Sequence, residues 1–209
     1  MNIKERTSSV LKILDDTYGP EKCYLHYTNA HELLIATILS AQCTDDRVNM
    51  VTPALFEKYP SVKAFAEADL SELEKDIHST GFYHNKAKNI IGCCQKLLND
   101  HGGIVPSDIE LLTALPGVGR KTANVVRTHI FHIPSIVVDT HVKRLSNLLG
   151  LTKESDPVKI EFDLMKKVPK DHWSRINTQL IAHGRAVCIA RRPKCEICVL
   201  YDCCKNRPK

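Results

Sequence analysis

The sequence has no apolar run long enough to cross a lipid bilayer. A membrane-spanning helix needs about 20 consecutive, mostly apolar residues, and no such stretch occurs among the 209 residues. The first residues, Met1 to Thr7, also lack the apolar core of a secretory signal peptide. We therefore expect no membrane contact and a cytoplasmic location, on the nucleoid if the source is a bacterium.

The sequence also lacks alternating apolar and polar residues, internal repeats and low-complexity segments. Apolar residues recur at helical spacing instead, which predicts an all-α chain of about ten helices. Residues 31–41 are apolar on nearly every side and predict a central buried helix. Pro53 is expected to begin a helix, because its missing N–H has no cost there. Asn85 is expected to cap a helix that stops at 101–103.

Charge distinguishes the C-terminal segment from the rest of the chain. Hydrophobic residues make up 43% and charged residues 25%, the balance of a globular protein, and the net charge is +5. Residues 184–209 contain seven basic residues against two acidic ones. This distribution is compatible with a polyanionic partner such as nucleic acid.

The segment Leu-Pro-Gly-Val-Gly-Arg-Lys-Thr-Ala, at 115–123, predicts two helices joined by a very short turn, an αα-hairpin. Gly117 and Gly119 leave backbone N–H groups open to close approach by another molecule. These groups lie at a helix N-terminus, which attracts anions such as phosphate. A purely structural turn is the alternative. Arg120 and Lys121 favour the phosphate site, because two cations at this end oppose the helix dipole unless an anion is bound.

Lys121 is the candidate nucleophile. The positive end of the helix dipole and the neighbouring Arg120 favour its uncharged amine. A free amine can attack a carbon at the aldehyde oxidation level and form a Schiff base. The alternative is an ordinary exposed helix lysine, and the position of Lys121 beside the glycine turn argues against it.

Asp139 ends the apolar connector Ile136–Val138 and precedes a helix. An aspartate here commonly caps the helix. We expect it to do so and also to face the site, where a carboxylate could act as a base or stabilise a developing positive charge.

The chain has nine cysteines, and five of them are crowded near the C-terminus. Cys188, Cys195, Cys198 and Cys204 have the spacing C-x6-C-x2-C-x5-C, which in a reducing compartment indicates a metal centre. Zinc and an iron–sulfur cluster both accept four thiolates. The outer spacings are longer than those of zinc ribbons and favour a cluster. Spacing alone does not decide between Cys203 and Cys204.

Arg191, Arg192 and Lys194 lie on the loop that the first two cysteine ligands would close. Cations on a rigid loop commonly contact the phosphate backbone. The alternative is a solvated loop that offsets the charge of the metal centre.

With these motifs the chain resembles the endonuclease III family of helix-hairpin-helix DNA glycosylases. The match runs from about Cys23 to Cys204, and its anchors are segments 115–123, 138–141 (Val-Asp-Thr-His) and 183–185 (His-Gly-Arg) and the cysteine tail. The resemblance implies two helical domains with a cleft between them. One is a six-helix barrel, 23–133, with the hairpin at about 109–128. The other is an iron–sulfur domain, 1–22 with 134–209, whose loop 188–204 binds a 4Fe-4S cluster through Cys204 rather than Cys203.

The family removes oxidised pyrimidines from double-stranded DNA and then cleaves the abasic site. The resemblance implies that Lys121 attacks C1′, releases the base and holds the sugar as an imine until β-elimination breaks the strand. Asp139 would stabilise the cationic sugar and assist proton transfer, with His141 as a neighbour in the site. The partner is then damaged or abasic duplex DNA, bound by a monomer.

The target base must leave the stack, and the gap must be filled. By resemblance, Gln42 and Phe82 enter the duplex. Relatives commonly carry leucine at the second position, and packing of Phe82 in the core is an equal alternative. Thr113 departs from the family, which has an acidic residue there, and 152–171 matches only loosely.

Three other functions remain open. A mismatch-specific glycosylase of the same superfamily generally lacks the lysine. A non-catalytic DNA-binding module would bind DNA without cleaving it. An electron-transfer protein would have no salt-dependent affinity for DNA.

Overall fold

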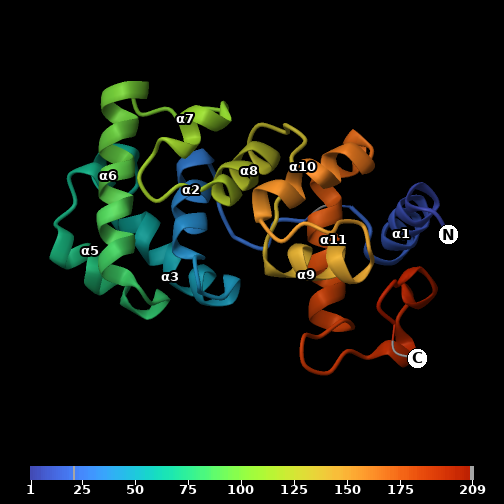
Figure 1. Cartoon of the computed structure of the whole chain (residues 1–209). Helices are drawn as coiled ribbons and strands as arrows, with labels where there is room; N and C mark the ends of the chain where they lie inside the picture. The colour runs from blue at the N-terminus through green and yellow to red at the C-terminus, as the bar shows by residue number, and fades with distance from the viewer. Residues whose placement is uncertain (21, 208–209) are drawn as a thin grey trace. The chain divides into compact units, whose positions relative to one another are not determined.

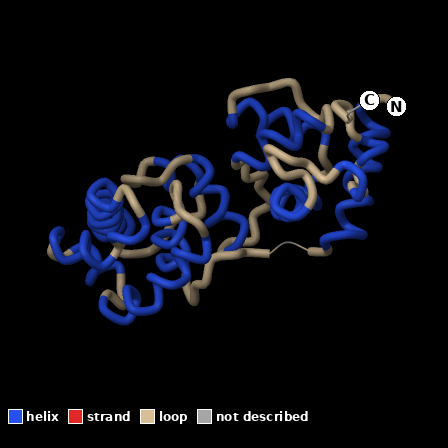
Figure 2. The backbone as a smooth tube through the Cα atoms, turned by 90° about the horizontal axis from the view of Figure 1, so that it is seen from below, coloured by secondary structure: helices blue, strands red, loops and turns tan. Residues whose placement is uncertain are grey.

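The structure, a computed structural model, describes residues 1–20 and 22–207, and these form helices and loops with no strand among them (Figures 1 and 2). The predicted all-α fold is therefore confirmed. The chain divides into two compact units. The continuous unit is Cys23–Ile133, and the split unit combines Met1–Lys22 with Pro134–Lys209. No helix in the described part of the chain is both long and apolar enough to cross a membrane.

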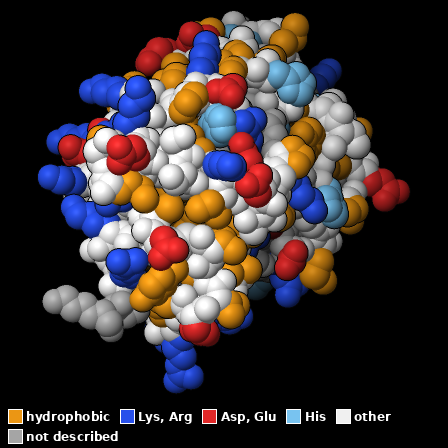
Figure 3. Space-filling model, turned by 90° about the vertical axis from the view of Figure 1, so that its right-hand side faces the viewer, with side chains coloured by type: hydrophobic (Ala, Val, Ile, Leu, Met, Phe, Trp, Pro, Cys, Tyr) orange, Lys and Arg blue, Asp and Glu red, His pale blue; other side chains and the backbone are white. Residues whose placement is uncertain are grey.

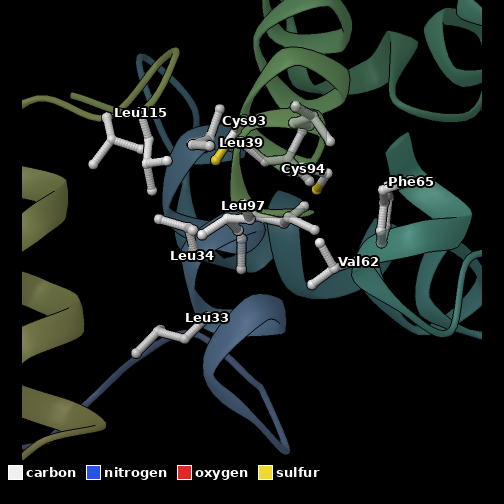
Figure 4. Close-up of a cluster of buried hydrophobic side chains, with 14 of the residues drawn as sticks. Leu33, Leu34, Leu39, Val62, Phe65, Cys93, Cys94, Leu97 and Leu115 are labelled. Atoms are coloured by element: carbon white, nitrogen blue, oxygen red, sulfur yellow. The ribbon is translucent and has the colours of Figure 1, made fainter. Parts of the chain in front are cut away.

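The continuous unit is built around one buried helix. Every residue of α2 from Leu33 to Leu39 is buried, as predicted for this segment. Figure 4 shows Leu33, Leu34 and Leu39 among side chains of the surrounding elements. Each buried side chain of this size contributes roughly 1.5–3 kcal/mol. The elements of this unit are α2 (Ala30–Leu39), α3 (Asp45–Lys58), α4 (Val62–Ala66), α5 (Leu70–Asp76), the 3₁₀-helix η1 (His78–Thr80), α6 (Tyr83–His101), α7 (Ile109–Thr113) and α8 (Arg120–His129).

The split unit joins the two ends of the chain. Helix α1 packs against α11 and η4 through an apolar face that contains Val10, Leu11 and Leu14. Asp15 on α1 accepts hydrogen bonds from Gln179 Nε2 and pairs with Arg175 Nε, both at 2.9 Å, which fastens α1 to α11. The elements are α1 (Ile3–Tyr18), α9 (Thr140–Leu148), α10 (Pro157–Lys167), η2 (Lys170–His172), α11 (Trp173–Ala186), η3 (Cys195–Ile197) and η4 (Tyr201–Cys203).

Two predicted helix starts are wrong. Pro53 lies inside α3, which Thr44 caps and which continues to Lys58. An interior proline costs roughly 3 kcal/mol, and the burial of Val48 and Leu55 on the same helix offsets this loss. Helix α6 begins two residues before Asn85, because Phe82 takes a left-handed conformation and turns the chain into the helix there.

Candidate functional site

The two hairpin glycines have different structural roles. Gly117 has a φ of +75°, and a Cβ there would lie 2.7 Å from Cβ of Asn89, so the fold itself requires glycine at this position. Gly119 has an extended backbone, with φ −84° and ψ 173°. A Cβ built at Gly119 would meet no atom within 4 Å other than those of its own residue and its neighbours along the chain, so packing against other parts of the protein gives no reason for glycine there. An approaching ligand would give one.

Helix α8 begins without a side-chain cap. Eight other helices of the described chain are capped by Asn, Ser, Thr or Asp. The residue at this position of α8 is Gly119, which has no side chain to offer, and the first turn contains no acidic residue. Lys121 is exposed in that turn, next to the half-buried Arg120. This helix end therefore offers N–H donors and cations to an anion.

Asp139 caps α9, as the sequence predicted. Its carboxylate accepts a hydrogen bond of 2.8 Å from the backbone N–H of Val142, and the residue is half-buried. Asp139 belongs to the split unit, whereas Lys121 belongs to the continuous unit. The carboxylate oxygen Oδ1 is occupied by the cap, which orients the group at the start of the helix.

His141, in the first turn of α9, packs tightly against α11. A Cβ at Gly184 would collide with Nδ1 of His141, so the glycine makes room for the ring. Burial lowers the pKa of His141, while the charge of Asp139 acts in the opposite direction. No described residue forms a hydrogen bond to its buried Nδ1.

Gln42 and Phe82 share an unusual backbone conformation. Their φ angles are +54° and +50°, and His132 is the only other non-glycine residue of the described chain with a positive φ. Such conformations are strained and cluster at functional sites. Gln42 is exposed, and Phe82 is 62% exposed. Phe82 is thus not packed in the core.

The four predicted cysteine ligands line one cavity of about 250 Å³ in the split unit. Burial raises the pKa of Cys198, and the neighbouring thiols of Cys188, Cys204 and Cys195 raise it further. The side chains are therefore close enough to influence one another. Among the described residues, no group of three or more Cys, His, Asp or Glu side chains is placed to hold a single metal ion.

Cys203 does not line this cavity; it is 5% exposed and packs in the core of the split unit. Burial raises the pKa of its thiol. The structure therefore separates two neighbouring cysteines that the spacing alone could not. Arg191, Arg192 and Lys194 are exposed on the loop between the first two cavity cysteines.

The structure adds three polar residues around the cavity that the sequence did not single out for this role. Arg144 donates to Cys188, at 3.4 Å to Sγ and 2.6 Å to the carbonyl oxygen. His183 lies 3.5 Å from Cys198 Sγ through Nε2, and its Nδ1 is 2.8 Å from the hydroxyl of Tyr18. The His-Gly-Arg segment was a signal for His183, but nothing in the sequence connected Tyr18 with the cysteine tail.

One face of the molecule carries side chains of both charges. On the face shown in Figure 3, basic and acidic side chains are interspersed with apolar ones.

Residues 35–170 match the family described as "HhH-GPD superfamily base excision DNA repair protein". Endonuclease III of Synechocystis sp. is 54% identical over 204 residues, covering 97% of this chain and 93% of the relative. Endonuclease III of Bacillus subtilis is 45% identical, and the match covers 100% of this chain and 95% of the relative. A solved non-covalent endonuclease III–DNA complex matches with a TM-score of 0.94 and 43% identity, over 99% of this chain and 97% of the other. A trapped covalent endonuclease III–DNA intermediate gives the same values.

The class defined by fold and site is thus the helix-hairpin-helix base excision repair proteins. Within it, this chain belongs to the endonuclease III family, whose members are DNA glycosylases and AP lyases. The resemblance read from the sequence is confirmed.

Proposed function

We propose that the protein removes oxidised pyrimidines from duplex DNA and then cleaves the abasic site, with Lys121 as its nucleophile. One observation carries the proposal. Lys121 is exposed in the first turn of α8, a helix that follows Gly119 and has no side-chain cap, and the chain belongs to the endonuclease III family.

In the first step, the uncharged amine of Lys121 attacks C1′ of the damaged nucleotide. The new N–C1′ bond replaces the bond to the base, which leaves with the electron pair and takes up a proton. Opening of the sugar ring then gives a protonated imine. Asp139 stabilises the positive charge that develops on the sugar, and a carboxylate can also transfer a proton there.

In the second step, loss of a proton from C2′ breaks the C3′–O3′ bond by β-elimination. The 3′ phosphate leaves with the electron pair of that bond, and the strand is cut. Water then hydrolyses the imine and restores the amine of Lys121.

DNA is held by the hairpin turn and by the cysteine loop in this proposal. The N–H groups around Gly117 and Gly119, with Arg120, bind a phosphate. Arg191, Arg192 and Lys194 contact the backbone elsewhere, with His141 near the reacting sugar. Gln42 and Phe82 fill the space that the displaced nucleotide leaves, because an exposed ring can enter between base steps.

We infer that Cys188, Cys195, Cys198 and Cys204 hold a 4Fe-4S cluster. The four thiols line one cavity, and their outer spacings of six and five residues are longer than those of zinc ribbons. Four thiolates, one for each iron, suit a cluster. The cluster would fold the C-terminal loop and present its cations, and no step of the reaction passes through it. Assay of iron and acid-labile sulfide tests this, and stoichiometric zinc would contradict it.

Borohydride trapping tests the catalytic proposal. The substrate is a duplex with one oxidised pyrimidine, compared with duplexes that carry a mispaired thymine or adenine. Wild-type protein and Lys63→Ala, an exposed lysine of α4, should form a covalent adduct with the oxidised duplex. Lys121→Ala should form none and should still bind DNA. An adduct with Lys121→Ala would exclude Lys121 as the nucleophile. Binding of DNA by the wild-type protein without any adduct would indicate a single-step glycosylase or a binding module.

A further inference from the structure

Lys86 is a buried lysine that the catalytic proposal does not use. It lies in the first part of α6 and is 4% exposed. Its ammonium group donates to two backbone carbonyls, 2.7 Å to Leu39 and 2.8 Å to Thr80. Burial of a charged amine is unfavourable, and it lowers the pKa of Lys86. A lysine kept in such a place therefore needs a role for its charge or its donors.

The two carbonyls are the last of their helices. Leu39 ends α2 and Thr80 ends η1. The carbonyls at a helix C-terminus lack partners within the helix and carry its partial negative charge, so a cation there is stabilising. One ammonium group thus joins two helix ends that are far apart in the sequence.

Each of these helix ends leads directly into a strained, exposed residue. Gln42 follows Leu39 by three residues, in a turn closed by hydrogen bonds from Ala41 to Ile38 and from Cys43 to Ser40. Phe82 follows Thr80 by two residues, and its carbonyl accepts a hydrogen bond from the N–H of Lys86. Three non-glycine residues of the described chain have a positive φ. Two of them, Gln42 and Phe82, thus lie within three residues of the carbonyls that Lys86 binds.

We propose that Lys86 is a positioning residue, which holds loops 40–43 and 80–82 together so that Gln42 and Phe82 enter the duplex as one unit. The inference rests on the proposed function of these two side chains. It goes beyond that function by naming the group that fixes their spacing. Without Lys86 each loop could still fold, but the two would lose their common anchor.

The test compares Lys86→Met with Lys96→Met, the same change on the same helix at a half-buried lysine that pairs with Asp100. Base release is measured in single turnovers with the lesion opposite a normal base, and again opposite an abasic spacer. Active protein is counted by borohydride trapping on a preformed abasic duplex, so a folding defect does not enter the rate. Unstacking a paired base requires more energy than extruding an unpaired one. We therefore expect Lys86→Met to slow release about tenfold more on the paired duplex, and Lys96→Met to match wild type. Equal slowing on both duplexes would overturn the proposal.

A double-mutant cycle tests the pathway of the effect. If Lys86 acts by positioning Phe82 for entry into the duplex, Lys86→Met should have little further effect in a Phe82→Ala background. Independent, multiplicative effects would overturn the proposal. If Lys86→Met does not fold, Lys86→Gln, which keeps an N–H donor, takes its place. A cycle between Gln42→Ala and Phe82→Ala needs no change at Lys86 and should show coupling.

The outcomes separate this inference from the function on which it rests. A wild-type protein that forms no imine would refute the proposed function. An active wild-type protein together with a Lys86→Met variant of equal activity on both duplexes would refute only the role of Lys86.

Discussion

At the scale of single residues, Gly117 and Gly119 provide a matched pair. Alanine at 117 would adopt a positive φ and collide with Asn89, so we expect Gly117→Ala to destabilise the protein by about 2 kcal/mol. Alanine at 119 has an allowed backbone and open space around it, so the expected loss of stability is that of a glycine N-cap alone, about 0.5–1 kcal/mol. The affinity of the Gly119→Ala variant for DNA should nevertheless fall, because the added methyl group obstructs the approach of a phosphate.

Urea unfolding and salt-dependent DNA binding measure the two effects separately. If Gly119→Ala bound DNA as tightly as wild type, the phosphate role of this turn would be excluded.

Cys203 and Cys204 form a second pair at this scale. Cys204→Ser should abolish the stoichiometric content of iron and sulfide, since it removes a thiol from the cavity wall. Cys203→Ser instead places a hydroxyl in the core, which should lower the free energy of unfolding by about 1 kcal/mol and leave the iron content unchanged. Iron analysis of the two purified variants decides, and the reverse result would exchange their roles.

At the scale of the helix, Asp139 has two separable properties, its capping oxygen and its charge. Asparagine is as good an N-cap as aspartate, so Asp139→Asn should keep the stability of α9 within a few tenths of a kcal/mol. Asp139→Ala should lose about 1 kcal/mol with the cap. Both variants should release the base much more slowly than wild type, because both lack the carboxylate.

Thermal unfolding and single-turnover base release distinguish capping from catalysis. A fully active Asp139→Asn would reduce this residue to a structural cap.

The sequence predicted most helices well, because their caps and apolar faces are local signals. Asp139 is an example, since an aspartate after an apolar connector is a strong cap signal. The start of α6 was missed because it depends on a left-handed Phe82, a conformation that no propensity favours. The role of Lys86 was also invisible, because its two acceptors lie 47 and 6 residues away and are backbone atoms without a sequence signature. The four cysteines that the spacing predicted as metal ligands line one cavity. The spacing alone did not decide between Cys203 and Cys204, whereas the family resemblance and the burial of Cys203 both favour Cys204.

At the scale of the whole molecule, the attachment of α1 to α11 should depend on pH. Burial of Asp15 works against its ionisation, but the hydrogen bond from Gln179 and the charges of Arg175 and His172 outweigh this and lower its pKa. A carboxyl group whose folded pKa is below its unfolded pKa stabilises the protein above the unfolded value. This contribution disappears as the pH falls through the folded pKa.

We therefore expect Asp15→Asn to be less stable than wild type at pH 7, with a difference that shrinks between about pH 5 and pH 2. Trp173, the only tryptophan of the chain, lies in the split unit, so its fluorescence reports on that unit. Asp16→Asn, an exposed neighbour on α1, is the control. A difference that stayed constant with pH would show that the charge of Asp15 is not what fastens α1.

The split unit, made from both ends of the chain, has a consequence for biosynthesis. The continuous unit is complete once residue 133 has left the ribosome, but α1 must wait for α11 and η4. At about 5–20 residues per second, synthesis of the remaining segment takes several seconds to some fifteen seconds. Until α11 and η4 have been made, the apolar face of α1 is without these two native partners, so a helix that is made early is buried late. A nascent chain stalled in this interval should consequently have a folded centre and an N-terminal helix available to chaperones.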